Sequence, residues 1–128
     1  MAVRVVRLGE PRAKDEGLRI GTVRRPPRGV PKSEYATQNW YDVWLPNHAP
    51  TAETVKRAQT ATTPAQWAAF TRQYRTEMAR PENRRVIDLL AALSHHANFS
   101  VGCYCADESR CHRAVLRTLL EDRGARIE

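Results

Sequence analysis

Short apolar strand patterns and amphipathic helix patterns follow one another along the chain, and this order restricts the fold more than any other feature. The predicted strands cover residues 3–8, 18–23 and 99–105, and the predicted helices cover residues 64–78, 82–96 and 111–123. Strands that are separated by helices form parallel sheets. We therefore predict one compact α/β domain over residues 1–128, with a small, mainly parallel β-sheet flanked by α-helices.

The middle of the chain has the pattern of structural scaffold. Thr63 and Gln66 have the spacing of a capping box, and Pro64 suits a first helical turn, so a helix should begin there. Large aromatic and apolar side chains at helical spacing usually anchor a core. We expect the core to include Trp40, Tyr41, Trp44, Trp67, Phe70, Tyr74, Met78, Val86, Leu89, Leu90 and Leu93.

Composition indicates a soluble protein of the cytoplasm. The 128 residues are 41% hydrophobic, which is enough for one buried core. No run approaches the roughly 20 apolar residues that span a bilayer, and no secretory leader is recognisable, so we expect no membrane contact. All three cysteines lie within residues 103–111 and are odd in number, which favours free thiols over a disulfide framework.

Positive charge is concentrated at the beginning of the chain. Residues 1–32 hold nine Arg or Lys against three acidic residues, out of a net charge of +7 for the whole chain. Within this basic part, the sequence RRPPRGVPK should form an irregular loop that displays Arg24 and Arg28 at a strand end. Such a surface suits an anionic small molecule or nucleic acid. The alternative is a solvated basic face that only confers solubility.

The Cys-rich segment, residues 99–124, predicts a strand, a loop and a helix. Strand alternation puts Cys103 and Cys105 on one face, and Cys111 should open the helix, with Asp107 or Ser109 as its N-cap. A first-turn position and the neighbouring Arg110 and Arg113 favour thiolate, so we expect Cys111 to be the most acidic thiol.

Three chemistries fit this segment. Cys103, Cys105, Cys111 and His112 make a legitimate zinc or iron ligand set, although C-x-C spacing suits a labile site better than a closed tetrahedron.

Covalent catalysis is the second possibility. Cys111, with Cys103 beside it, could act as a nucleophile, and His112 or His48 could act as the base. Neighbouring helical residues diverge, so we expect the base to come from outside the helix.

Anion binding is the third possibility, at the helix N-terminus with help from Arg110 and Arg113. The alternative to all three is that the cysteines are small buried hydrophobes.

The chain resembles the bacterial proteins grouped as domain of unknown function 488 (DUF488). The resemblance rests on the Cys-His-Arg helix start after a strand and loop, and it extends over nearly the whole chain. Cys105 stands where many members have Glu, so a carboxylate role is not carried over. The other matching residues are Arg19, Arg24, Pro27, Arg28, Gly29, Trp44, Leu45, Ala49, Pro50, Trp67, Phe70 and Tyr74. The resemblance implies a compact α/β fold and brings no activity with it.

Two functions remain open on the sequence. One is an enzyme that acts on an anionic, phosphate-bearing substrate through a reactive cysteine or a bound metal. The other is a non-catalytic module that binds nucleic acid or an anion and has structural cysteines. Both use Arg24, Arg28 and Arg113 to hold the anion.

Overall fold

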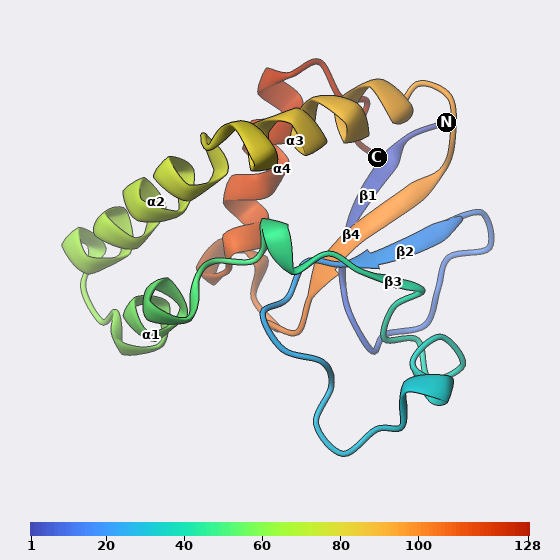
Figure 1. The fold of residues 1–128 in the computed structure, drawn as a ribbon, viewed down its shortest axis with the longest axis horizontal. Coiled ribbons are helices and arrows are strands. Elements are labelled where there is room, and N and C mark those ends of the chain that lie inside the picture. The colour runs from blue at the N-terminus through green and yellow to red at the C-terminus, as the bar shows by residue number, and fades with distance from the viewer.

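The computed structural model describes all 128 residues and has four strands and four α-helices (Figure 1). The strands are β1 (Val3–Arg7), β2 (Leu18–Gly21), β3 (Val43–Trp44) and β4 (Phe99–Cys103). The helices are α1 (Ala52–Thr60), α2 (Pro64–Met78), α3 (Pro81–Leu93) and α4 (His112–Asp122). Short 3-10 turns cover Lys32–Glu34, Pro46–His48 and Glu108–Arg110. None of the helices combines the length and the apolar character that crossing a lipid bilayer requires.

The sheet is wholly parallel, with the strand order β1-β4-β2-β3, so the α/β prediction is confirmed. The last strand in the sequence, β4, is central, and all five of its residues are buried. Val101 pairs with Val5 on one side and with Ile20 on the other. Because all strands run the same way, their carboxyl ends meet at one edge of the sheet, where Cys103 pairs with Arg7.

The main core lies between the sheet and the helices, which gather to one side of the sheet in Figure 1. Val101 and Phe99 of β4 meet side chains of α2, α3 and α4. The stripe predicted for α2 is confirmed, since Phe70, Tyr74 and Met78 are buried. Thr63 and Gln66 form the predicted capping box at the start of this helix.

Several expectations about the scaffold were wrong. In α3 Leu90 is buried and Val86 packs against the core, as predicted, but Leu89 is 62% exposed and Leu93 is 38% exposed. Ile87, which was not predicted, is buried in their place. Trp44 is 42% exposed, although Tyr41 is buried as expected.

The face of the sheet away from the helices is covered by irregular chain. Gly21 allows the Tyr41 ring to lie directly on β2, because a Cβ at that position would overlap the ring. Tyr41 joins a second core cluster with Leu8, Val23 and two of the cysteines, Cys103 and Cys111. This cluster lies at the carboxyl edge of the sheet, and its two cysteines belong to the candidate site described below.

Candidate functional site

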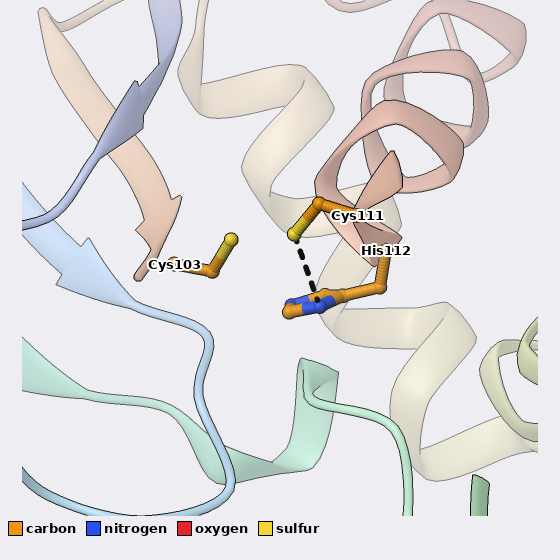
Figure 2. A group of neighbouring side chains, drawn as sticks. All are labelled: Cys103, Cys111 and His112. Carbon is orange, nitrogen blue, oxygen red and sulfur yellow. Dashed lines mark hydrogen bonds between the residues drawn. The ribbon is translucent and has the colours of Figure 1, made fainter. Parts of the chain in front are cut away.

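The Cys-His-Arg segment meets the central strand at the carboxyl edge of the sheet. Cys103 is the last residue of β4, and His112 is the first residue of α4. Figure 2 shows the side chains of Cys103, Cys111 and His112 directed toward one another across the gap between strand and helix. Ligands bind at this edge in parallel α/β sheets.

Three donor atoms come together here. The Sγ atoms of Cys103 and Cys111 and a ring nitrogen of His112 all lie within 4.8 Å of one another, and all three residues are buried. Cys111 Sγ lies 3.6 Å from His112 Nδ1 (Figure 2). The prediction that His112 would not face Cys111 was therefore wrong.

The backbone of Cys111 explains that contact. Cys111 is not in the first turn of α4 but is its N-cap residue, with an extended backbone (φ −138°, ψ 151°). An extended residue followed by a helical one does not obey the 100° helical rotation, so neighbouring side chains can converge. The predicted caps were wrong as well, since Asp107 accepts a hydrogen bond from the Ser109 N–H in the preceding 3-10 turn.

A backbone carbonyl fixes the tautomer of His112. Its Nε2 lies 2.7 Å from the carbonyl oxygen of Thr22, which can only accept, so Nε2 carries the proton and Nδ1 keeps its lone pair. Thr22 is itself held by a hydrogen bond of 3.0 Å from its Oγ1 to the Gly102 carbonyl. The Tyr74 ring lies edge-on to the imidazole at 5.4 Å. Burial lowers the pKa of His112 to about 4, so the ring is neutral at physiological pH.

The three thiols have different acidities. The neighbouring thiols of Cys103 and Cys111 lower the pKa of Cys105 to about 2. The neighbouring thiol of Cys105, together with burial, raises the pKa of Cys103 to about 12. The thiols of Cys103 and Cys105, followed by burial, also raise the pKa of Cys111. The expectation that Cys111 is the most acidic thiol was wrong, because it is 2% exposed whereas Cys105 is exposed beyond the end of β4.

The candidate arginines have different surroundings. Arg113 is buried, and its Nη2 donates to the Cys105 carbonyl at 2.6 Å, so it braces the loop after β4, while its Nε has no partner. Arg110 is exposed. Arg24 donates to the carbonyl oxygens of three residues in the turn before α1, which leaves Arg28 as the displayed cation. The three acceptors are Pro46, Ala49 and Pro50.

His48, the other base that the sequence offered, is completely buried and lies outside the three-donor group. Its Nε2 faces the Asn83 carbonyl at 3.1 Å, and its own carbonyl accepts a hydrogen bond from the Tyr74 hydroxyl at 2.7 Å. Burial lowers the pKa of His48. These contacts make His48 part of the scaffold behind the site.

The separation of two of the donors matches that of ligands on a tetrahedral metal ion. Zinc lies about 2.3 Å from sulfur and about 2.0–2.1 Å from nitrogen, which separates a tetrahedral S and N pair by about 3.6 Å. Cys111 and His112 have this separation. A histidine ligand usually donates its second ring N–H to a carbonyl or carboxylate, as His112 does to Thr22. The arrangement can hold a metal through three ligands, and Cys105, which is exposed, is not one of them.

Sequence reasoning missed two supporting residues. Thr22 follows β2 directly and acts through its backbone carbonyl, which carries no side-chain signal. Tyr74 was assigned to the core, and it is there, but its ring also borders the imidazole of His112. Only the parallel pairing of β2 with β4 brings Thr22 to the site.

The fold and the site together define a small parallel α/β protein with a Cys-His-Arg helix start at the end of its central strand. The family model DUF488-N3a, described as the active DUF488-N3 subclade, matches residues 3–124. The chain therefore belongs to the DUF488 family, as the resemblance implied. No curated protein and no solved structure gives a significant match to the chain.

Proposed function

We propose that this protein is an enzyme that binds zinc through Cys103, Cys111 and His112 and acts on an anionic substrate at the carboxyl edge of its sheet. The observation that carries the proposal is the convergence of these three buried donors within 4.8 Å. The fixed tautomer of His112 supports it, because the free lone pair of Nδ1 faces Cys111. The description of the matching subclade as active agrees with catalysis.

Three protein ligands are typical of catalytic zinc, whereas structural zinc has four. Cys105 is exposed and lies outside the three-donor group, so the fourth position is left for water or substrate. Zinc in that setting supplies a Lewis acid or an activated water. Arg110, which precedes Cys111 in the chain, and Arg28, which lines a groove together with Tyr104, are exposed cations that suit a substrate with a phosphate or carboxylate group.

The test is the metal content of protein purified without a histidine tag. We expect zinc that a chelator removes without unfolding the chain, and an affinity that falls at least about a hundredfold in His112→Gln. The matched control is His96→Gln, since His96 is exposed and makes no side-chain hydrogen bond. Cys105→Ser should keep its zinc. Equal zinc binding by His112→Gln and the control would refute the site.

The open position has its own test. Cobalt in a tetrahedral thiolate site absorbs visible light, so the cobalt form reports on its fourth ligand. Inorganic phosphate should change that spectrum. A spectrum that no anion alters, together with loss of metal in Cys105→Ser, would mean a closed structural site and would contradict the enzyme.

The second candidate is a non-catalytic module that binds an anion or nucleic acid. It is favoured by exposed arginines without acidic partners in the basic part of the chain, such as Arg25 and Arg28. If this candidate is right, the protein should bind the anion or nucleic acid equally well after complete removal of the metal. The bound ligand should also remain chemically unchanged after prolonged incubation with the zinc form of the protein.

A further inference from the structure

A groove of about 710 Å³ lies between the loop that contains Pro26 and Pro27 and the start of the Cys-rich segment. Its walls come from the segment after β1, from the loop around Pro26 and Pro27, and from Trp40 and Tyr104. Tyr104 lies between Cys103 and Cys105 in the chain, and Leu8 both lines the groove and packs in the cluster that contains Cys103. The groove is therefore a neighbour of the three-donor group, to which Leu8 and Tyr104 connect it.

The cations of this groove are poorly neutralised. Arg25 and Arg28 are exposed and form no salt bridge, and Arg7 reaches its one acidic neighbour, Glu10, only at 3.9 Å. Three guanidinium groups thus face one carboxylate. Elsewhere in the basic part of the chain, arginines are paired closely, as Arg12 is with Asp42 at 2.7 Å. An unneutralised arginine cluster attracts phosphate groups.

The same groove presents two aromatic rings. Trp40 is half-buried and meets Tyr104 edge to face, with the ring centroids 5.8 Å apart. Trp40 rests against Gly9, where a Cβ would come within 2.8 Å of the indole, and the Tyr104 hydroxyl donates to the Arg25 carbonyl at 2.8 Å. These contacts fix both rings in place. Fixed aromatic rings beside arginines are the elements that bind a stacked base and its phosphate.

We propose that this groove binds a nucleoside phosphate, either free or as a unit of single-stranded nucleic acid, with its base against Trp40 and Tyr104 and its phosphates on Arg25, Arg28 and Arg7. The rigid Pro-Pro segment holds Arg25 and Arg28 at a fixed separation on the rim. This site is distinct from the metal ligands and does not require that a metal be bound.

Fluorescence anisotropy with a labelled dT12 oligonucleotide tests the proposal. At low salt, Arg25→Ala/Arg28→Ala should weaken binding at least about tenfold and reduce the slope of log K against log salt by about 1.4, since each phosphate contact on a single strand contributes about 0.7. The matched control is Arg84→Ala/Arg85→Ala, which removes two exposed, unpaired arginines from α3 and the same charge. It should stay within about twofold of wild type.

A second pair of variants tests stacking. Trp40→Leu should weaken binding about tenfold, whereas Trp40→Phe keeps an aromatic face and most of the affinity. Circular dichroism of both variants checks that they fold.

Competition for the labelled oligonucleotide by AMP, inorganic phosphate and a duplex of the same length identifies which kind of ligand the groove prefers. Competition by AMP at micromolar concentration indicates a free nucleotide, and competition by oligonucleotide alone indicates a strand. Three results would each overturn the proposal. Inorganic phosphate could compete as strongly as AMP, the duplex could compete as strongly as the single strand, or the control variant could lose as much affinity as Arg25→Ala/Arg28→Ala. Repeating the assay with His112→Gln separates this proposal from the proposed metal site, because the variant should still bind the oligonucleotide in the groove.

Discussion

Two buried tyrosine hydroxyls have opposite surroundings. The hydroxyl of Tyr74 donates to the His48 carbonyl at 2.7 Å, whereas the hydroxyl of Tyr41 has no hydrogen-bond partner. Both side chains are at most 3% exposed. A buried polar group without a partner loses its hydrogen bonds to water and gains none in return. The same chemical change at the two positions should therefore have different effects.

We expect Tyr74→Phe to lower the free energy of unfolding by about 1 kcal/mol, because a hydrogen bond is lost and the His48 carbonyl is left alone. Tyr41→Phe should be neutral or should stabilise by up to about 1 kcal/mol. Urea unfolding of the two variants measures both values. A loss of equal size in Tyr41→Phe would mean that its hydroxyl is hydrogen-bonded in solution.

The three thiols should differ in their access to a reagent. Cys105 is exposed, whereas Cys103 and Cys111 are 1% and 2% exposed. In zinc-free native protein, iodoacetamide should modify Cys105 at least about tenfold faster than the other two, which react only when the structure opens. Peptide mass spectrometry follows each site. Modification of Cys111 first would show that the N-cap of α4 opens to solvent.

At the scale of elements, helix α1 is attached to α2 by polar contacts around one carboxylate. Glu77 of α2 accepts hydrogen bonds from the Thr51 N–H and Oγ1 and from Thr54 Oγ1, at 3.0, 2.9 and 2.6 Å. Gln73 donates to the same carboxylate. Burial alone would raise the pKa of Glu77, but these hydrogen bonds together lower it below the ordinary 4.5.

The attachment of α1 should therefore depend on pH. Because the folded-state pKa of Glu77 lies below the unfolded one, its stabilisation is complete above the unfolded value and is lost as pH falls through the folded value. Glu77→Gln should lower the free energy of unfolding by about 2 kcal/mol at pH 7. At pH 3 the difference should shrink, because the wild-type carboxyl group also takes up protons.

Glu82→Gln, an exposed change in the first turn of α3, is the control and should cost a few tenths of a kcal/mol. Chemical denaturation at the two pH values supplies the comparison. If Glu77→Gln lowered the free energy of unfolding by the same amount at both pH values, the proposed dependence on the protonation of Glu77 would be wrong.

Helix α1 also illustrates what sequence patterns could not predict. The long helices α2 and α4 were predicted because their apolar stripes repeat at helical spacing, and β1, β2 and β4 because they are short apolar runs. Helix α1 buries only Thr54 and is held by Glu77, a contact with no apolar signature. The candidate site was predicted only in part, because its geometry also depends on contacts that leave no pattern in the sequence. The Cys-His-Arg motif marked its place, but the extended backbone of Cys111, which turns it toward His112, appears only in the folded chain.

At the scale of the whole molecule, the candidate site joins the sheet to the helical layer. Cys103 belongs to β4, His112 to α4, and Thr22, which holds the imidazole, follows β2. A metal bound there would add bonds between β4 and α4, in addition to packing and the hydrogen bond between His112 and Thr22. Ligands that bind only the folded state stabilise it in proportion to the logarithm of their concentration.

Zinc at a hundred times its dissociation constant should therefore raise the global free energy of unfolding by about 2.7 kcal/mol. Thermal unfolding monitored with increasing zinc measures the effect. His112→Gln should lose it, whereas His96→Gln should retain it. Equal stabilisation of both variants would place the zinc elsewhere on the protein.

The two edge strands of the sheet determine whether copies of this molecule can pair with one another through their backbones. Along β1, Val3 forms a parallel bridge to Ile127 and exchanges backbone hydrogen bonds with Arg126 and Glu128. At the opposite border, β3 is only two residues long. Free strand edges are the usual starting points of intermolecular β-pairing, and short or covered edges prevent it. Concentrated solutions of the folded chain should therefore resist fibril growth, and this resistance should disappear once the last three residues detach from β1.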